Sequence, residues 1–110
     1  MQQNTGTLKM SLAVRAVSEI DPHLTLTHLG VLLVISRKPG CNPGDLITEL
    51  GISSAAAARL VARVSDWENP VVKGLGLVSS EMDPWDRRKR NLFLTPKGQR
   101  LINRIEEVLA

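Results

Sequence analysis

The middle of the chain carries the start and stop signals of two short helices that are separated by only three residues. Asn42 is a good N-cap, and Pro43 suits the first helical position because its missing N–H would have no partner there. Gly51 suits the stop, since glycine readily takes the left-handed conformation that ends many helices. Ser53 can cap the second helix. Two helices joined by such a turn form a helix-turn-helix, predicted here over residues 43–67, and its second helix can enter a DNA major groove.

Amphipathic helices are predicted on both sides of this unit. Apolar residues at helical spacing predict a helix over residues 7–20, one from the N-cap Thr25 to just before Pro39, and a last one over residues 96–109. The apolar positions of the two terminal helices are Leu8, Leu12, Val17 and Ile20, and Leu101, Ile102, Ile105, Val108 and Leu109. Both terminal helices are candidates for dimerisation, and they can pack together within one monomer or across a two-fold axis.

A charged β-hairpin is predicted over residues 78–95, directly before the last helix. Residues 78–82 and 92–95 alternate polar and apolar side chains as strands do, and Thr95 can cap the helix that follows. The tip between the strands carries four consecutive cations, Arg87, Arg88, Lys89 and Arg90. Because crowded like charges repel, this run does not help the chain to fold, and it suits an anion such as a phosphate backbone or a narrow minor groove.

Length and composition favour one domain over residues 1–110, with a single modest core. Aromatic residues make up only 3% of the chain, so a platform for stacking single-stranded bases is not expected. The net charge is only +3, and it becomes informative because four of the 14 cations lie in one run.

The sequence gives no signal of secretion, membrane insertion or catalysis. The N-terminus lacks the features of a signal peptide, and the longest apolar run, around residues 31–35, is too short to cross a bilayer, so we expect a cytoplasmic protein. The single cysteine, Cys41, excludes an internal disulfide, and its loop is expected to expose it. His23 and His28 have no ligand partners at metal spacing. We therefore expect no metal, no cofactor and no enzymatic activity.

A helix-turn-helix followed by a charged hairpin is a winged helix, a mostly α fold with one small β-hairpin. Particular residues of the wing and of the helix-turn-helix also match a known family pattern. They are Asp83-Pro84, Asp86-Arg87-Arg88, Leu92, Leu94, Thr95-Pro96 and Gly98, and Leu50-Gly51-Ile52-Ser53 and Arg59-Leu60-Val61. Over about residues 24–98 the chain resembles the MarR family of bacterial transcription regulators. The resemblance implies a homodimer that places paired recognition helices in successive major grooves and paired wing arginines in flanking minor grooves.

The residues expected to contact double-stranded DNA form two groups. They are Ser53, Ser54, Ala55, Ala57, Arg59 and Arg63 at the second helix of the helix-turn-helix, and Arg87, Arg88, Lys89 and Arg90 in the wing. Arg87 and Arg88 are expected to enter the minor groove. Asp83 and Asp86 flank the arginines, and we expect them to pair with a guanidinium and fix the shape of the wing, as the resemblance also implies.

Three features depart from the family pattern. Alanine fills residues 55–58, where resembling proteins carry polar side chains, so recognition should depend more on DNA shape and phosphates than on base contacts. Residues 66–77 form a longer link to the wing, of which residues 71–77 are expected to be a loop. Of the two tryptophans, Trp67 is expected at the edge of the core, whereas Trp85 at the hairpin tip can wedge against DNA or a protein partner, or fold back. The third departure is a short C-terminal end, which predicts a small or differently built dimer interface.

The function expected from these features is a transcription regulator that represses by binding a pseudo-palindromic duplex site as a homodimer. No cluster of residues names a small-molecule effector. The alternative is a winged-helix protein–protein interaction module, such as a phage or plasmid accessory protein. The alanine run and the short end favour this alternative.

Overall fold

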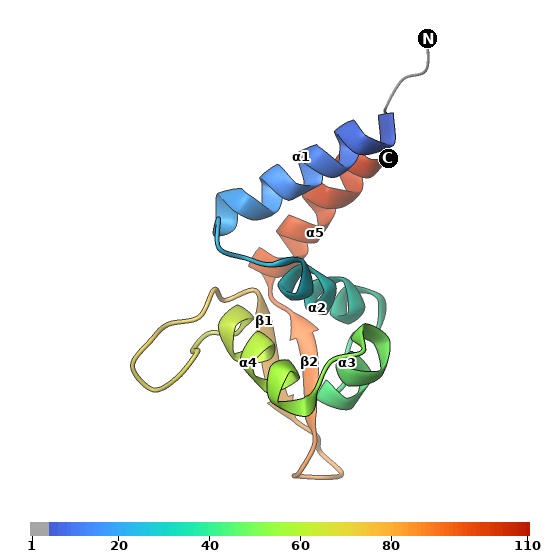
Figure 1. Ribbon diagram of the computed structural model, residues 1–110. Helices are drawn as coiled ribbons and strands as arrows, with labels where there is room; N and C mark the ends of the chain where they lie inside the picture. The colour runs from blue at the N-terminus through green and yellow to red at the C-terminus, as the bar shows by residue number, and fades with distance from the viewer. Residues whose placement is uncertain (1–4) are drawn as a thin grey trace.

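The computed structural model describes residues 5–110 of the chain, so residues 1–4 of the expected domain lie outside the described residues. The helices and strands of this part are α1 (Thr5–Ile20), α2 (Leu26–Arg37), α3 (Pro43–Leu50), α4 (Ser54–Val64), β1 (Val78–Met82), β2 (Arg90–Leu94) and α5 (Pro96–Leu109). Helices α2, α3 and α4 pack with the β1–β2 hairpin at one end of the molecule, and α1 and α5 lie side by side at the other (Figure 1). The predicted winged helix-turn-helix, mostly α with one small hairpin, is confirmed.

The predicted helix starts are confirmed by their capping hydrogen bonds. The Asn42 side chain accepts from the Asp45 amide at 3.1 Å, and Gly51 ends α3 at a φ of 63°. The Ser53 hydroxyl accepts from the Ala56 amide at 3.1 Å at the start of α4. The Thr95 hydroxyl accepts from the Gly98 amide at the same distance, 3.1 Å, at the start of α5. These short-range signals therefore fix the helix-turn-helix locally.

Helix α4 ends at Val64, so the prediction of a helix continuing to residue 67 was wrong. The chain turns back on itself directly after the last turn, and backbone amides of the returning segment bind the carbonyls that the helix leaves open. The Leu75 amide donates to the Arg63 carbonyl at 2.9 Å, and the Leu77 amide donates to the Val64 carbonyl at 2.7 Å. Because helix ends need partners for their carbonyls, these bonds determine where α4 stops.

The link between α4 and β1 contains a narrow turn of chain, residues 66–74, which we call the side hairpin. A single β-bridge pairs Trp67 with Lys73, and the Gly74 amide donates to the Asp66 carbonyl at 2.8 Å. Trp67 is 54% exposed, and the Lys73 ammonium lies 5.9 Å from the centre of its ring. The expected position of Trp67 at the core edge was therefore wrong. Figure 1 shows the side hairpin projecting beside α4.

The wing strands pair antiparallel with Val78 opposite Leu94 and Ser80 opposite Leu92. A third segment, at Cys41, joins them through a β-bridge in which the Leu92 amide donates to the Cys41 carbonyl at 2.8 Å. This bridge buries Cys41, so the expectation of an exposed cysteine was wrong. Burial raises the pKa of the Cys41 thiol, which lowers its thiolate fraction and its reactivity.

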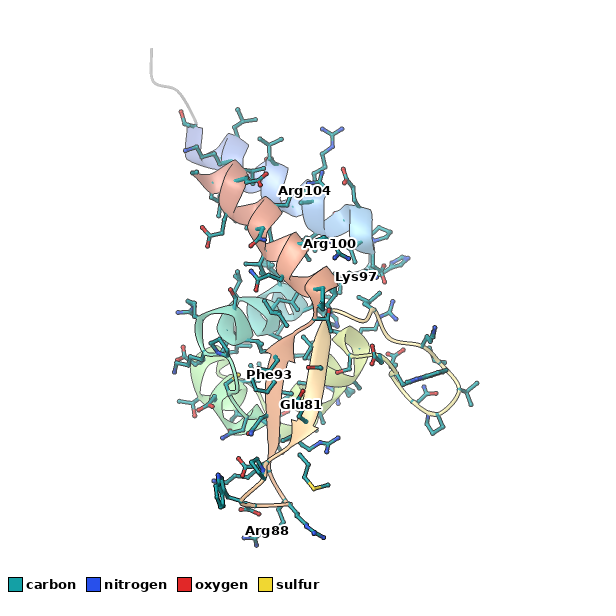
Figure 2. All side chains as sticks on the ribbon, turned by 180° about the vertical axis from the view of Figure 1, so that it is seen from behind. Glu81, Arg88, Phe93, Lys97, Arg100 and Arg104 are labelled. Atoms are coloured by element: carbon teal, nitrogen blue, oxygen red, sulfur yellow. The ribbon has the colours of Figure 1, made fainter. Side chains whose placement is uncertain are left out.

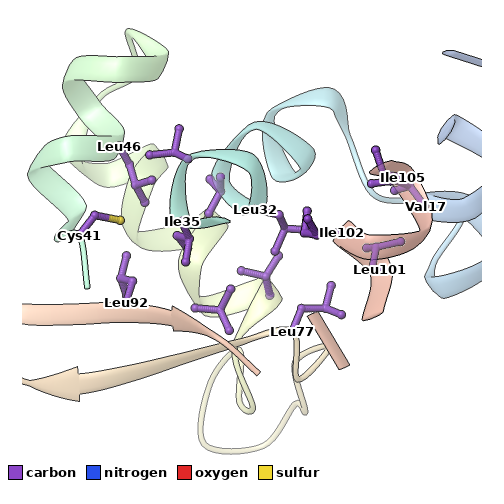
Figure 3. Packing of buried hydrophobic residues seen from close by; sticks show 14 of the residues in the cluster. Val17, Leu32, Ile35, Cys41, Leu46, Leu77, Leu92, Leu101, Ile102 and Ile105 are labelled. Atoms are coloured by element: carbon purple, nitrogen blue, oxygen red, sulfur yellow. The ribbon is translucent and has the colours of Figure 1, made fainter. Parts of the chain in front are cut away.

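One apolar cluster joins the winged helix to the α1–α5 pair (Figure 3). Its fully buried members from six elements or links are Val31, Leu32, Val34, Ile35, Leu46, Val64, Leu77, Val78 and Leu92. On the α1 side, Ala13, Ala16 and Val17 are buried, whereas two predicted contact residues, Leu8 and Leu12, are 61% and 38% exposed. Helix α1 thus packs on α5 through small side chains and leaves several larger ones on its surface.

Candidate nucleic-acid interface

The outer face of α4 presents a short row of small and polar side chains. Ser54, Ala55, Ala58 and Arg59 are exposed, and the N-cap Ser53 precedes them. The first turn of a helix directs free N–H groups outward, so this end suits a phosphate, and the exposed alanines offer only methyl groups to a base edge.

Ala57 does not belong to this face, and its prediction as a DNA contact was wrong. It is 0% exposed, because it lies on the same side of α4 as the buried Val64, seven residues on, and the half-buried Val61, four residues on. Residues four and seven apart share one side of a helix. That spacing was visible in the sequence and would have excluded Ala57.

The wing tip is a hydrogen-bonded loop, and Asp83 is the residue that organises most of it. One carboxylate oxygen of Asp83 accepts from the Trp85 amide at 2.8 Å and from the Asp86 amide at 3.0 Å. The other accepts from the Asn91 side chain at 3.2 Å. The backbone closes the same loop, since the Asp83 amide donates to the Lys89 carbonyl at 3.0 Å. Asp83 therefore holds backbone groups, whereas it was expected to hold a guanidinium.

Asp86 makes the second set of contacts in the tip. Its carboxylate accepts from the Arg88 amide at 3.0 Å and from the Arg88 Nε at 3.3 Å. The Arg88 side chain nevertheless remains 93% exposed at the far end of the hairpin (Figure 2). Arg87 and Lys89 are exposed beside it. The tip therefore carries three outward cations on a backbone that its own carboxylates keep in shape.

Arg90 differs from the other three cations of the run. It is the first residue of β2 and pairs with Met82, so it belongs to the ladder of the hairpin, where a tip position was expected. Its side chain is exposed. The four sequence-predicted wing cations thus divide into three in the loop and one on the strand.

The hydrogen bonds to Asp83 lower the pKa of its carboxyl group, first through the Trp85 amide and then through the Asp86 amide. A lowered folded-state pKa means that the ionised form is the one the fold prefers, and its contribution is lost as the pH falls through that pKa. We expect Asp83→Ala to lower the melting temperature by a few degrees, because the contribution of the ionised carboxylate is lost, and to increase amide hydrogen exchange at Trp85 and Asp86 by about ten-fold or more. Glu81→Ala, on the exposed edge of β1, is the control. Unchanged exchange at both amides in Asp83→Ala would contradict the organising role.

Comparison with known proteins supports the fold and shows which family the chain resembles. Residues 24–68 match the MarR family model. The transcriptional regulator HosA of Escherichia coli O111:H- is 32% identical over 81 residues, which cover 74% of this chain and 54% of HosA. The chain resembles the MarR family in sequence and in fold. It spans about half the length of the curated relatives it matches, and those relatives are transcriptional regulators rather than enzymes.

Solved structures agree with this assignment. A crystal structure of MarR has a TM-score of 0.68 and 26% identity, with 92% of this chain and 68% of that chain covered. The MepR–DNA complex of Staphylococcus aureus has a TM-score of 0.76 at 16% identity, with 94% of this chain and 77% of MepR covered. The MarR-family fold therefore extends over nearly all of this chain.

In this chain, the Arg63 guanidinium is partly buried, and carboxylates of the protein hold it. It forms an ion pair with Asp21, at the end of α1, and lies 3.9 Å from a carboxylate oxygen of Glu68 in the side hairpin. The Asp21 carboxylate also accepts from the His23 amide at 2.8 Å, and this bond and Arg63 lower the pKa of Asp21. Arg63 was expected to reach a phosphate. Here it links three segments instead, and this role could not be read from the sequence because Asp21 is 42 residues away.

The Arg63 ion pair gives a test of this link. We expect Arg63→Ala to lower the melting temperature by a few degrees, because it leaves the largely buried Asp21 carboxylate without its cation. Arg59→Ala removes an exposed cation one turn earlier on the same helix and should leave the melting temperature unchanged. Thermal unfolding followed by circular dichroism compares the two. Equal melting temperatures for both variants would show that the ion pair contributes nothing to stability.

Residues 5–110 contain no group of three or more His, Cys, Asp or Glu side chains placed to hold a metal ion. None of the helices in this range is both long and apolar enough to span a membrane.

Proposed function

We propose that the chain binds double-stranded DNA and regulates transcription, most simply by repression at the site it covers. The observation that carries the proposal is the preorganised wing tip, with Arg87, Arg88 and Lys89 exposed on a loop that Asp83 and Asp86 hold in shape. The wing projects at the end of the molecule where α3 and α4 lie, which supports the same function (Figure 1). MepR, a similar fold, has been solved in complex with DNA.

In the proposed complex, the two parts of the surface contribute differently. Helix α4 enters a major groove, where Ser53 and Ser54 contact a phosphate through the helix N-terminus and Arg59 reaches the backbone or a base. Ala55 contributes a methyl contact, so base readout in the major groove is sparse. Arg87 and Arg88 enter the minor groove, whose negative potential is strongest where it is narrow. Lys89 and Arg90 contact phosphates, and the wing thus supplies much of the affinity.

We propose that the active form is a homodimer on a pseudo-palindromic site. Helix α1 leaves Leu8, Met10, Leu12 and Val14 between 38% and 61% exposed, and Leu109 of α5 is 41% exposed. These apolar side chains give a second copy a surface to cover. Half-sites would then lie about one helical turn apart, about 10 base pairs centre to centre. Such a regulator acts in the cytoplasm, and any small-molecule effector would act by changing the spacing of the two α4 helices.

Selection from a pool of random duplexes tests the proposal, followed by a salt titration with the enriched duplex. Contacts to several phosphates predict that the logarithm of the affinity falls linearly with the logarithm of salt, by about 0.9 per phosphate neutralised. Fluorescence anisotropy of the labelled duplex measures this slope. No enrichment, and no retention of duplex DNA at low salt, would reject the proposed function.

The side hairpin favours a second candidate function, a winged-helix module that binds another protein. Its residues Trp67, Val71 and Val72 are 54%, 85% and 43% exposed, which makes a small apolar surface away from the wing. The salt titration also separates this candidate, since an apolar interface weakens little with added salt.

A further inference from the structure

Trp85 is the most exposed large apolar side chain among residues 5–110, with 94% of its surface open to solvent. The sequence has only three aromatic residues, two tryptophans and one phenylalanine. The other two have neighbours within the fold: Phe93 lies close to Gly40, and Trp67 lies beneath the Lys73 ammonium. Trp85 differs from both. An indole can bury about 150 to 250 Å², but the Trp85 side chain is left almost fully exposed.

The backbone that carries Trp85 is fixed. Its amide donates to Asp83 at 2.8 Å, and the next amide, of Asp86, donates to the same carboxylate oxygen at 3.0 Å. Pro84, directly before it, restricts the chain further. A side chain held outward on an ordered loop loses little entropy when it binds, which makes it suitable as an anchor.

The charges around Trp85 indicate what it meets. Arg87, Arg88 and Lys89 follow within four residues, and all three are exposed. An apolar ring surrounded by cations matches a surface with apolar faces between anionic groups, and a DNA minor groove, with stacked bases between phosphates, has that chemistry. Proteins that bind the minor groove often insert an apolar side chain at a base step, beside arginines that hold the backbone.

We infer that Trp85 is an apolar wedge that packs against a base step in the minor groove between the phosphates held by the wing cations. The inference rests on the proposed function. It adds a residue whose binding depends on how easily a DNA base step is deformed. Pyrimidine–purine steps such as TA and CA unstack most easily, so a wedge favours sites with such a step under the wing. The few base contacts expected from α4 would then be supplemented by selection for an easily deformed base step under the wing.

The test uses the intrinsic fluorescence of Trp85 itself. The Trp67→Phe variant retains Trp85 as the sole tryptophan, because the sequence has two. Quenching by acrylamide, which is uncharged and so insensitive to the field of DNA, is measured with and without saturating duplex selected by the wild-type protein. We expect duplex to reduce the quenching constant by about two-fold or more.

Affinity measured by anisotropy supplies the second readout. Base–aromatic stacking is typically lost at a cost of about ten-fold in affinity, so we expect Trp85→Ala to weaken binding by about that factor and Trp85→Phe by less. Trp67→Phe is the matched control and should bind like the wild type. In duplexes where the step under the wing is changed from TA to AA, the wild type should lose affinity and Trp85→Ala should lose little.

The outcomes separate the inference from the function on which it rests. If the wild type binds the duplex but acrylamide quenching is unchanged, or Trp85→Ala binds as tightly as the wild type, the wedge is excluded and DNA binding stands. If the wild type binds no duplex at all, the proposed function fails and the wedge with it. Trp85→Ala must keep the wild-type melting temperature, as expected for a residue so exposed.

Discussion

Gly98→Ala is expected to destabilise the protein by about 2 to 3 kcal/mol, which corresponds to a fall in melting temperature of about 10 to 20 °C. An added Cβ at Gly98 would lie 2.1 Å from the Leu77 carbonyl oxygen and 3.3 Å from a methyl group of Leu94. The carbonyl cannot move aside cheaply, because it already accepts from the Thr95 amide at 3.0 Å and belongs to a fully buried residue. The start of α5 must therefore lift away from the core.

Gly6→Ala is the matched control for this substitution. An added Cβ at Gly6 meets nothing within 4 Å, and the residue lies in the first turn of α1. Alanine there should leave stability unchanged or raise it by up to about 1 kcal/mol. Thermal unfolding of both variants measures the contrast. Equal melting temperatures would mean that α5 can shift without cost, against the packing described here.

The Arg87→Ala/Arg88→Ala double variant is expected to weaken duplex binding by about 100-fold at low salt and to reduce the salt slope by up to about 3.6, because it removes four arginines from the proposed homodimer. Both side chains are exposed on the wing tip, so the melting temperature should not change. The loss should be larger on duplexes with AT-rich flanks, where a narrow minor groove attracts arginine most strongly. Anisotropy titrations at several salt concentrations measure the affinity and the slope together.

A control must remove the same charge from another part of the molecule. Arg15 is exposed on α1 and Arg100 on α5, at the end of the molecule opposite the wing. Figure 2 shows Arg100 on α5. The Arg15→Ala/Arg100→Ala variant should keep most of the affinity. If both double variants lose affinity equally, net charge alone attracts the DNA and the wing has no special part.

The parts of the fold that the sequence predicted well depend on neighbouring residues. Asn42, Ser53 and Thr95 cap their helices through amides three residues on, so a short stretch contains the whole interaction. The two strands of the wing are likewise joined by a short loop with its own turn residues. Such features can be predicted from the sequence because the residues that interact lie within a few positions of one another.

The parts that were predicted wrongly depend on distant segments. The end of α4 is fixed by amides of Leu75 and Leu77, and the burial of Cys41 by a bridge to Leu92. The Arg63–Asp21 ion pair joins the last turn of α4 to the residue that follows α1. Ala57 is different, because its burial follows from the period of α4 and was available in the sequence.

The division of α4 into a buried and an open side bears on how its binding preference could change. Ala55 and Ala58 are exposed, while Ala57 and Val64 hold the helix to the core. Substitutions at exposed helix positions usually alter stability by less than about 0.5 kcal/mol. Asparagine, glutamine or arginine could therefore be introduced at Ala55 and Ala58 to install new base preferences on an unchanged scaffold. If α4 enters the major groove as proposed, its exposed methyl groups constrain the target sequence little, and a few substitutions there would be enough to change it.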